Sequence, residues 1–340
     1  MLIYLLRRLN LLVLTALVLL GLLYIASLKM PGDTLTNLSG VTHPSQEQVA
    51  RLTERYHLDG NGLQGYLAFV RQRLTGDFGL SQASGRPVLN ELLQVIPATL
   101  ELTILALLLA LLVGIPLGVL AAGRRGPLPN LLWGGTLLGF SVPTFWLGLL
   151  LMLTFGLSLD ALPASGRINL LYDVPFVTGF MLVDILLSDA PWRWAALWDA
   201  INHLVLPTLV LAALPCFIVI RTIRAAMLAE MDKNYIRALM ARGVPRYRLV
   251  LSHALPNSLA PMLRLLSLQL GQIASGVIIV EMIFTWPGIG SWLLAAQYQG
   301  DHTALTGGVL VVALSIIVLT ILLEIAQALL NPVIRKEIHG

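Results

Sequence analysis

Charged side chains are scarce in this sequence, and their scarcity excludes an ordinary soluble globular domain. Only 12% of the 340 residues are charged, whereas 57% are hydrophobic, and the mean hydropathy is +0.81. A soluble domain carries roughly 25% charged residues. The composition therefore predicts a chain that lies in a lipid bilayer.

Cysteine is almost absent as well, and the single residue Cys216 permits neither an intramolecular disulfide nor a cysteine-based metal site. The six histidines are scattered without the spacing of metal ligands. The sequence contains no HExxH, GxSxG or GxxxxGKS/T motif, and no paired carboxylates at helical spacing inside an apolar run. We therefore expect that this chain is not an enzyme and binds no cofactor or metal.

Long uncharged runs, by contrast, are abundant. Each is expected to cross the membrane as a helix, because a spanning segment in lipid must satisfy its own backbone hydrogen bonds. The runs are Leu9–Leu28, Leu102–Gly123, Gly126–Leu159 (with the span in its later part), Leu204–Ile220, Leu265–Val280 and Thr303–Leu323. The fourth and fifth are short and are bounded by ionisable residues. The sequence predicts an all-α membrane protein with six transmembrane helices.

The basic residues predict the orientation of these helices. Arg7 and Arg8 place the N-terminus on the cytoplasmic side. Six spans bring further basic residues to the same side, namely Arg124, Arg125, those of the 221–248 segment, Arg335 and Lys336. The first apolar run is long for a cleaved secretory signal and is expected to remain as the first helix. Both termini are thus predicted to be cytoplasmic, with a large outer segment after the first helix.

The charged segment between the fourth and fifth runs carries most of the functional information. Good helix formers fill Ala225–Arg242, Gly243 allows a tight turn, and Pro245 can open a second helix. Two short helices are therefore expected to meet at Gly243. The basic residues leave a second interpretation open, in which the segment lies against anionic lipid; they are Arg237, Arg242, Arg246 and Arg248.

Ala238, Gly243 and Leu255–Pro256 stand at the spacing of a known loop, the EAA loop of bacterial ABC importer permeases, which this segment resembles. The chain departs from that motif at Arg237, Leu239 and His253, which replace an acid, the second alanine and an isoleucine. The resemblance implies that residues 225–257 form a cytoplasmic coupling loop that enters a groove on an ATPase subunit. The expected ATPase-coupling residues are Arg237, Ala238, Leu239, Arg242, Gly243, Leu255 and Pro256.

Further segments resemble the dipeptide and oligopeptide branch of these permeases and follow the family's order. They are GDFGLS at 76–81 with GRPV at 85–88, PATLEL at 97–102, LPASGR at 162–167 and EMIFTWPGIG at 281–290. Ser291 stands where an arginine commonly follows the last of them. The resemblance covers nearly the whole chain. It implies an N-terminal helix with a periplasmic segment at residues 1–96 and a permease core of five transmembrane helices at residues 97–335.

The resemblance also implies the partners and the cargo. Such a chain is a subunit of a bacterial inner-membrane importer of di- or oligopeptides. It works with a second homologous permease subunit, two ATP-binding subunits that hold ATP and Mg²⁺, and a periplasmic substrate-binding protein; no nucleic acid is expected. Residues 170–193 resemble the Sap-type permease instead, which leaves transport of putrescine or antimicrobial peptides open. These residues could equally form a hairpin that packs on the partner permease. A non-translocating assembly subunit and a channel gated without ATP are the remaining alternatives.

Four residues near the outer end of the fifth run are the expected pathway or periplasmic-gate residues: Glu281, Trp286, Pro287 and Gly288. An acid at this depth should face protein or water, although Glu281 could instead form a structural ion pair or a hydrogen bond to the turn that follows it. Trp286 and Trp292 are expected in the interfacial aromatic belt. The outer aspartates are expected to be solvated, or to attract cationic cargo; they are Asp160, Asp173, Asp184, Asp189 and Asp199.

Overall fold

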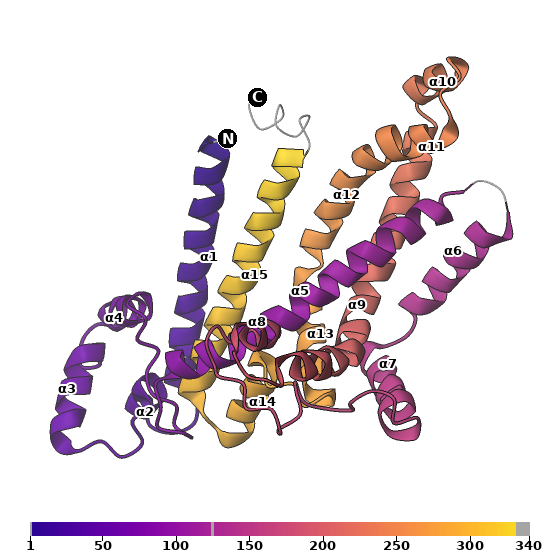
Figure 1. Ribbon diagram of the computed structural model, residues 1–340. Coiled ribbons are helices and arrows are strands. Elements are labelled where there is room, and N and C mark those ends of the chain that lie inside the picture. Colours follow the sequence, from indigo (N-terminus) through magenta and orange to yellow (C-terminus); the bar gives the residue numbers. More distant parts are fainter. Residues whose placement is uncertain (1, 124–125, 331–340) are drawn as a thin grey trace. The chain divides into compact units, whose positions relative to one another are not determined.

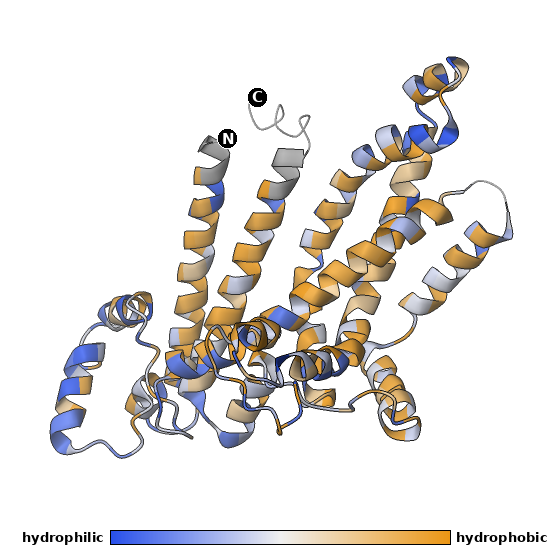
Figure 2. Ribbon diagram, in the orientation of Figure 1, coloured by the Kyte–Doolittle hydropathy of each residue, from blue (hydrophilic) through white to orange (hydrophobic). Residues whose placement is uncertain are grey.

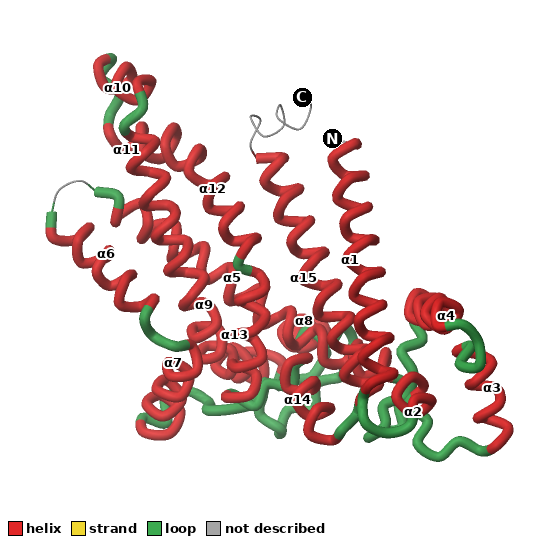
Figure 3. The backbone as a smooth tube through the Cα atoms, turned by 180° about the vertical axis from the view of Figure 1, so that it is seen from behind, coloured by secondary structure: helices red, strands yellow, loops and turns green. Residues whose placement is uncertain are grey.

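The computed structural model describes residues 2–123 and 126–330, and the regular elements within these ranges are all helices (Figures 1 and 3). The described chain has no strand, only an isolated bridge between Leu80 and Pro87. The predicted all-α class is therefore confirmed. The basic residues Arg124, Arg125, Arg335 and Lys336, on which part of the predicted orientation depends, lie outside the described residues.

Four helices in the described ranges are long and apolar enough to cross a membrane. They are α1 (Leu2–Lys29), α5 (Val88–Ala121), α9 (Arg193–Met231) and α15 (His302–Leu330). Two helix pairs pass the same test together, but each pair is bent: Pro127–Phe140 with Thr144–Ser158 by 101°, and Arg246–Leu268 with Leu270–Ile283 by 58°. The described residues thus contain four spans, or up to six if each bent pair is one span. Apolar residues run along these helices in Figure 2.

The run Gly126–Leu159 differs from its prediction because proline interrupts it. It forms α6 (Pro127–Phe140), α7 (Thr144–Leu151) and the π-helical η1 (Met152–Ser158), and the bend falls between α6 and α7. Pro143 lies in that break with an extended backbone, at φ −63° and ψ 138°. Proline has no N–H to donate to the helix, and it biases the residue before it away from helical angles. A straight helix through this position is therefore disfavoured.

The fourth predicted span is the middle of a much longer helix. α9 has 39 residues, so at 1.5 Å per residue it is about 58 Å long, roughly twice the hydrocarbon thickness of a bilayer. Pro207 and Pro215 both lie inside it and are buried. Because α9 is so long, its end projects beyond the apolar run and carries the segment that follows.

Two glycines allow α5 to pack closely on α9. A Cβ atom on Gly114 would lie 2.8 Å from Val219 Cγ1, and a Cβ atom on Gly118 would lie 2.8 Å from Ile223 Cβ. This GxxxG spacing is a known signal for close helix packing in membranes. Val219 and Ile223 also belong to a buried cluster that joins α9 to η2 (Leu249–Ala254) and α12 (Leu255–Leu268); its other members are Met227, Ala254 and Met262.

The described structure divides into two compact units. The first comprises Leu100–Trp286 and the chain from Val318, and it also contains α8 (Met181–Leu187), α10 (Asn234–Ala241), α11 (Arg246–Arg248) and α13 (Leu270–Ile283). The second comprises Leu2–Thr99 and Pro287–Ile317, with α2 (Thr34–Ser39), α3 (Gln46–Tyr56), α4 (Gly62–Leu74) and α14 (Ile289–Gln299). Each unit has its own buried apolar core.

Buried Asp301 organises the second unit just before α15. Its carboxylate accepts hydrogen bonds from the Ser81 hydroxyl at 2.6 Å, the Ala83 N–H at 3.2 Å and the Ala304 N–H at 2.9 Å. The predicted outer segment is therefore folded onto the start of the last long helix. Tyr56 and Phe69 are fully buried in the core of this unit.

Candidate functional site

The charged segment between α9 and α12 forms two short helices, but its first part differs from the prediction. α9 ends at Met231 and α10 begins at Asn234, so the single helix expected over Ala225–Arg242 is interrupted. Lys233 in the break has an extended backbone, and the adjacent Asp232 and Asn234 are poor helix formers. Figure 1 shows α10 and α11 together at the far end of α9 and α12.

The turn at Gly243 is confirmed and has a defined hydrogen-bond pattern. Gly243 adopts φ +78°, and its N–H donates to the Met240 carbonyl at 3.0 Å. The Val244 N–H donates to the Leu239 carbonyl at 3.2 Å. These two bonds around a left-handed residue are a Schellman motif, which ends a helix. An added Cβ atom would meet no described atom within 4 Å, so the backbone angle, not crowding, favours glycine here.

The structure separates the seven predicted coupling residues into a surface group and a base group. Arg237, Ala238, Arg242 and Gly243 are exposed on α10 and its turn, whereas Leu239 is half-buried. Leu255 is half-buried against the cluster of α9 and α12, and Pro256 follows it in the first turn of α12, where proline is tolerated. The surface group is placed to meet another protein directly, and in the base group Pro256 is also exposed whereas Leu255 is not.

The surface of this segment is basic. Lys233, Arg237, Arg242, Arg246 and Arg248 are all exposed, and Figure 2 shows hydrophilic residues gathered at the turn between α10 and α11. The nearest acid before the segment, Glu230, is buried at the end of α9. Glu230 was not among the predicted site residues. Its position four residues before Asn234, next to the predicted coupling segment, was the available signal.

A second charged group, Glu101 on α5 with Arg167, lies inside the first unit. The Arg167 guanidinium donates to Glu101 Oε2 at 2.5 Å and to the Gly179 carbonyl at 2.9 Å. Glu101 also accepts the backbone N–H groups of Met181 at 3.3 Å and Leu182 at 2.9 Å, at the start of α8. The side chains are 10% and 4% exposed for Arg167 and Glu101, so this is a buried ion pair. It fixes the loop of residues 167–182 to α5.

Trp286 contacts the same ion pair, and its position corrects a prediction. The Arg167 guanidinium carbon lies 5.6 Å from the centre of the Trp286 ring, and Trp286 is fully buried. Because its side chain is fully buried, Trp286 does not face lipid as a member of the predicted interfacial aromatic belt would. Glu281 on α13 is fully buried too, and its backbone carbonyl accepts the backbone N–H of Trp286 at 2.8 Å.

The other two predicted gate residues lie in the second unit. Pro287 begins the Pro287–Ile317 segment of that unit, and Gly288 caps α14, with its carbonyl accepting the Ser291 hydroxyl at 2.9 Å. Trp292, also predicted in the aromatic belt, donates its indole N–H to Glu91 at 3.0 Å. Each of these contacts lies within the second unit.

Asp184 is another correction, because it is buried and not solvated. Its carboxylate accepts backbone N–H groups of Val177, Thr178 and Gly179 at 3.3, 2.7 and 2.9 Å, and the Thr178 hydroxyl at 2.6 Å. Burial alone would raise the pKa of Asp184, but these hydrogen bonds outweigh it and hold the pKa below its usual value. Asp184 therefore fixes the loop before α8.

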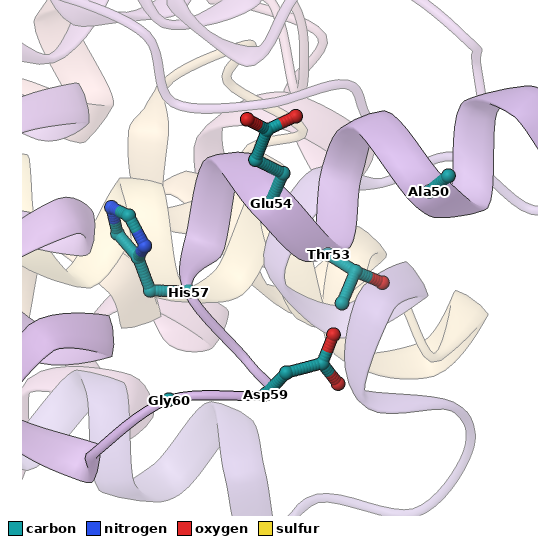
Figure 4. A pocket seen from close by; sticks show the side chains of 6 residues that line it. All are labelled: Ala50, Thr53, Glu54, His57, Asp59 and Gly60. Carbon is teal, nitrogen blue, oxygen red and sulfur yellow. The ribbon is translucent and has the colours of Figure 1, made fainter.

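An open pocket of about 500 Å³ lies on the second unit, between the end of α3 and the turn after it. It is lined by Ala50, Thr53, Glu54, His57, Asp59 and Gly60, and Figure 4 shows the acidic and histidine side chains pointing in different directions. Among the described residues, no group of three or more His, Cys, Asp or Glu side chains could hold a metal ion. These side chains thus do not converge on a common point.

Comparison with known proteins gives consistent matches over most of the chain. Residues 114–336 match the family described as binding-protein-dependent transport system inner membrane component. The peptide transport system permease protein SapB of Salmonella typhimurium (strain LT2) is 44% identical over 262 residues, which are 77% of this chain and 82% of that protein. The putrescine export system permease protein SapB of Escherichia coli (strain K12) is 43% identical over the same shares. The dipeptide transport system permease protein DppB of that strain is 36% identical over 341 residues, 99% of this chain and 100% of that protein.

Proposed function

The chain belongs to the family of binding-protein-dependent transport system inner membrane components, and on this premise we propose that it is a permease subunit of an ATP-driven importer of di- or oligopeptides. The observation that carries the proposal is the exposed α10 and its glycine-ended turn at the end of α9 and α12, within a chain that aligns over its whole length with a dipeptide permease. A permease of this kind performs no chemistry, so we propose that ATP and Mg²⁺ bind to separate subunits.

We further propose that α10 enters a groove on one of two ATP-binding subunits. Ala238 is small and exposed, which allows close approach of the helix backbone, and Arg237 and Arg242 beside it offer charge-assisted hydrogen bonds. Leu255 and Pro256 belong to the base of the same coupling loop, residues 225–257, and connect its movement to α12. Movement of the ATP-binding subunits would then reach the membrane helices of the permease core, residues 97–335.

The remaining partners follow from the same assignment. A second homologous permease subunit would complete the pathway, and a periplasmic substrate-binding protein would deliver the peptide to the outer side, where residues 1–96 supply the large outer segment. With α10 on the cytoplasmic side, both termini are cytoplasmic. Glu281 and Trp286 remain the proposed residues near the outer end of the pathway, with Pro287 and Gly288 as the start of the segment that follows them.

Transport of putrescine is the second candidate function, because one of the most similar relatives is named a putrescine export system permease protein. Residues 170–193 are where this chain resembles that type of permease. Their structure favours a packing role for part of them, since Asp184 and the half-buried Tyr172, whose ring lies 5.5 Å from that of Trp192, face the interior of the first unit.

Uptake measurements test both candidates. Cells with and without this chain are given labelled dipeptide and, in parallel, labelled putrescine, before and after ATP depletion. Loss of ATP-dependent dipeptide uptake on deletion is the expected result. Unchanged dipeptide uptake with altered putrescine flux would replace the peptide assignment with polyamine transport, and no change in either would refute both cargo assignments.

A further inference from the structure

A buried carboxylate lies at the base of α10 and contacts three polar side chains from the surrounding elements. Glu230, in the last turn of α9, has a side chain that is only 9% exposed. Its Oε1 accepts the Tyr235 hydroxyl at 2.6 Å and the Asn257 amide at 2.9 Å, while its Oε2 lies 2.5 Å from Lys233 Nζ. We call these four residues the Glu230 cluster.

The hydrogen bonds of the Glu230 cluster form a closed set. The Asn257 amide nitrogen also donates to the Tyr235 hydroxyl oxygen at 3.1 Å, so Tyr235 donates to the carboxylate and accepts from the amide. An ionised carboxylate accepts only, which fixes the amide of Asn257 with its nitrogen toward Glu230. The direction of each of these hydrogen bonds is therefore fixed. A closed set of this kind holds its members in one arrangement more firmly than separate bonds would.

Three of the four members come from three different helices. Glu230 lies in the last turn of α9, Tyr235 in α10 and Asn257 in the first turn of α12, while Lys233 lies in the break before α10. α9 and α12 are already joined by their shared apolar cluster. α10 supplies no member of that cluster, and Ile236 is the one buried residue among its described residues. The Tyr235 hydroxyl adds a polar connection from α10 to both of the helices that carry it.

The break before α10 means that the hydrogen bonds of Tyr235 affect how α10 can rotate. Asp232 and Lys233 separate α9 from α10, and the extended backbone at Lys233 interrupts the helical hydrogen bonds there. Without a further constraint, a force applied to α10 would rotate it about this break. With Tyr235 held to Glu230 and Asn257, the same force displaces the ends of α9 and α12.

We propose that Glu230, Tyr235 and Asn257 are positioning residues that hold α10 in a fixed orientation on α9 and α12, so that movement of an ATP-binding subunit is passed to the membrane helices. This inference rests on the proposed coupling role of α10. It assigns no contact with ATP or cargo to the three residues. Their effect is on the ratio of transport to ATP hydrolysis.

Tyr235→Phe is the most direct test, because it removes one hydroxyl and retains the ring. The complete transporter, with both permease subunits and the ATP-binding subunits, is reconstituted in vesicles with its binding protein and dipeptide. ATP hydrolysis and dipeptide uptake are measured in the same vesicles. We expect hydrolysis to continue while uptake per ATP falls at least about fivefold, the lower end of ordinary coupling effects. Tyr298→Phe, at a tyrosine that is 85% exposed on α14, is the matched control and should behave as wild type.

Asn257→Leu is the second variant, because leucine keeps the size of the side chain without the amide. If both residues act through the same cluster, the double variant is no worse than the poorer single variant. Additive losses, or wild-type uptake per ATP in Tyr235→Phe, would overturn the inference. A merely structural defect would instead lower the amount of complex and leave uptake per ATP unchanged. Absence of ATP-dependent dipeptide uptake in the wild-type transporter would refute the proposed function itself, which distinguishes the two failures.

Discussion

Replacing Gly243 by arginine is expected to leave the protein in the membrane and to abolish ATP-driven transport. The glycine has φ +78°, and a non-glycine residue in the left-handed region costs roughly 1–2 kcal/mol. An added Cβ atom meets no described atom within 4 Å, so no further clash with the chain itself is expected. The strain is therefore limited to the turn, and a change of that size at one exposed turn should not prevent insertion of six apolar runs.

Three substitutions separate the strain from the bulk of the side chain. Asparagine tolerates left-handed angles, so Gly243→Asn should retain most transport. Gly243→Ala adds the strain alone, and 1–2 kcal/mol corresponds to roughly a 5–30-fold shift in a local equilibrium. Gly243→Arg adds the same strain and a long charged side chain on the surface that is proposed to enter the ATPase groove. The expected order of transport is wild type, Asn, Ala and then Arg.

The assay compares membrane abundance, recovery of the ATP-binding subunits with the purified permease, and ATP-dependent dipeptide uptake for each variant. Reduced recovery of the ATP-binding subunits with Gly243→Arg, at normal abundance, is the expected pattern. Normal uptake by Gly243→Arg would refute the docking role of this turn. Equal defects in Ala and Arg would show that the turn geometry, and not the docking surface, is what matters.

Three further predictions concern the first unit. Arg167→Leu leaves Glu101 buried without its ion pair and should destabilise the protein by about 3–5 kcal/mol, seen as a lower melting temperature in detergent; an unchanged melting temperature would contradict the buried pairing. Asp184 has a lowered pKa, so its stabilising effect is present above the ordinary carboxyl pKa of about 4 and is lost as the pH falls through the lower folded-state pKa. The melting temperature of wild type should therefore exceed that of Asp184→Asn from pH 5 to pH 8, and the difference should shrink toward pH 3; a difference that grows on acidification would disprove the reasoning. Gly118→Leu should separate α5 from α9, because even a Cβ atom would lie 2.8 Å from Ile223 Cβ, and it should reduce the amount of folded protein recovered, whereas undiminished recovery would argue against this close packing.

Local signals explain what the sequence predicted correctly. The helical class and the four long apolar helices follow from composition and run length, and the turn at Gly243 follows from one glycine after a short helical segment. Pro143 was a local signal for the bend between α6 and α7, but the long uncharged run around it favoured the prediction of a single span. The interruption at Asp232–Lys233 was missed because good helix formers on both sides outweighed the two unfavourable residues Asp232 and Asn234.

Burial of polar side chains could not be predicted in the same way, because it depends on contacts between distant residues. Glu101 and Arg167 are 66 residues apart, and only the fold brings them together. Glu101 lies in PATLEL and Arg167 in LPASGR, two segments that resemble the family. The motifs therefore marked both residues, but they did not show that the two side chains form an ion pair. Asp184 looked like a solvated loop residue until three backbone N–H groups were found around it.

Because α9 is so long, it can act as a lever whose two ends move in opposite directions. One uninterrupted helix carries Asp199, which accepts the Asn169 N–H at 2.7 Å from the preceding loop, and Glu230 at the base of α10. A tilt of about 5° about the middle of a helix about 58 Å long would move its two ends by about 2.5 Å in opposite directions. Pro207 and Pro215 are the places where such a helix can bend, so they determine how much of the tilt reaches the far end. A lever works in both directions: while α9 stays straight, displacement of the loop at Asn169 and displacement of α10 accompany each other.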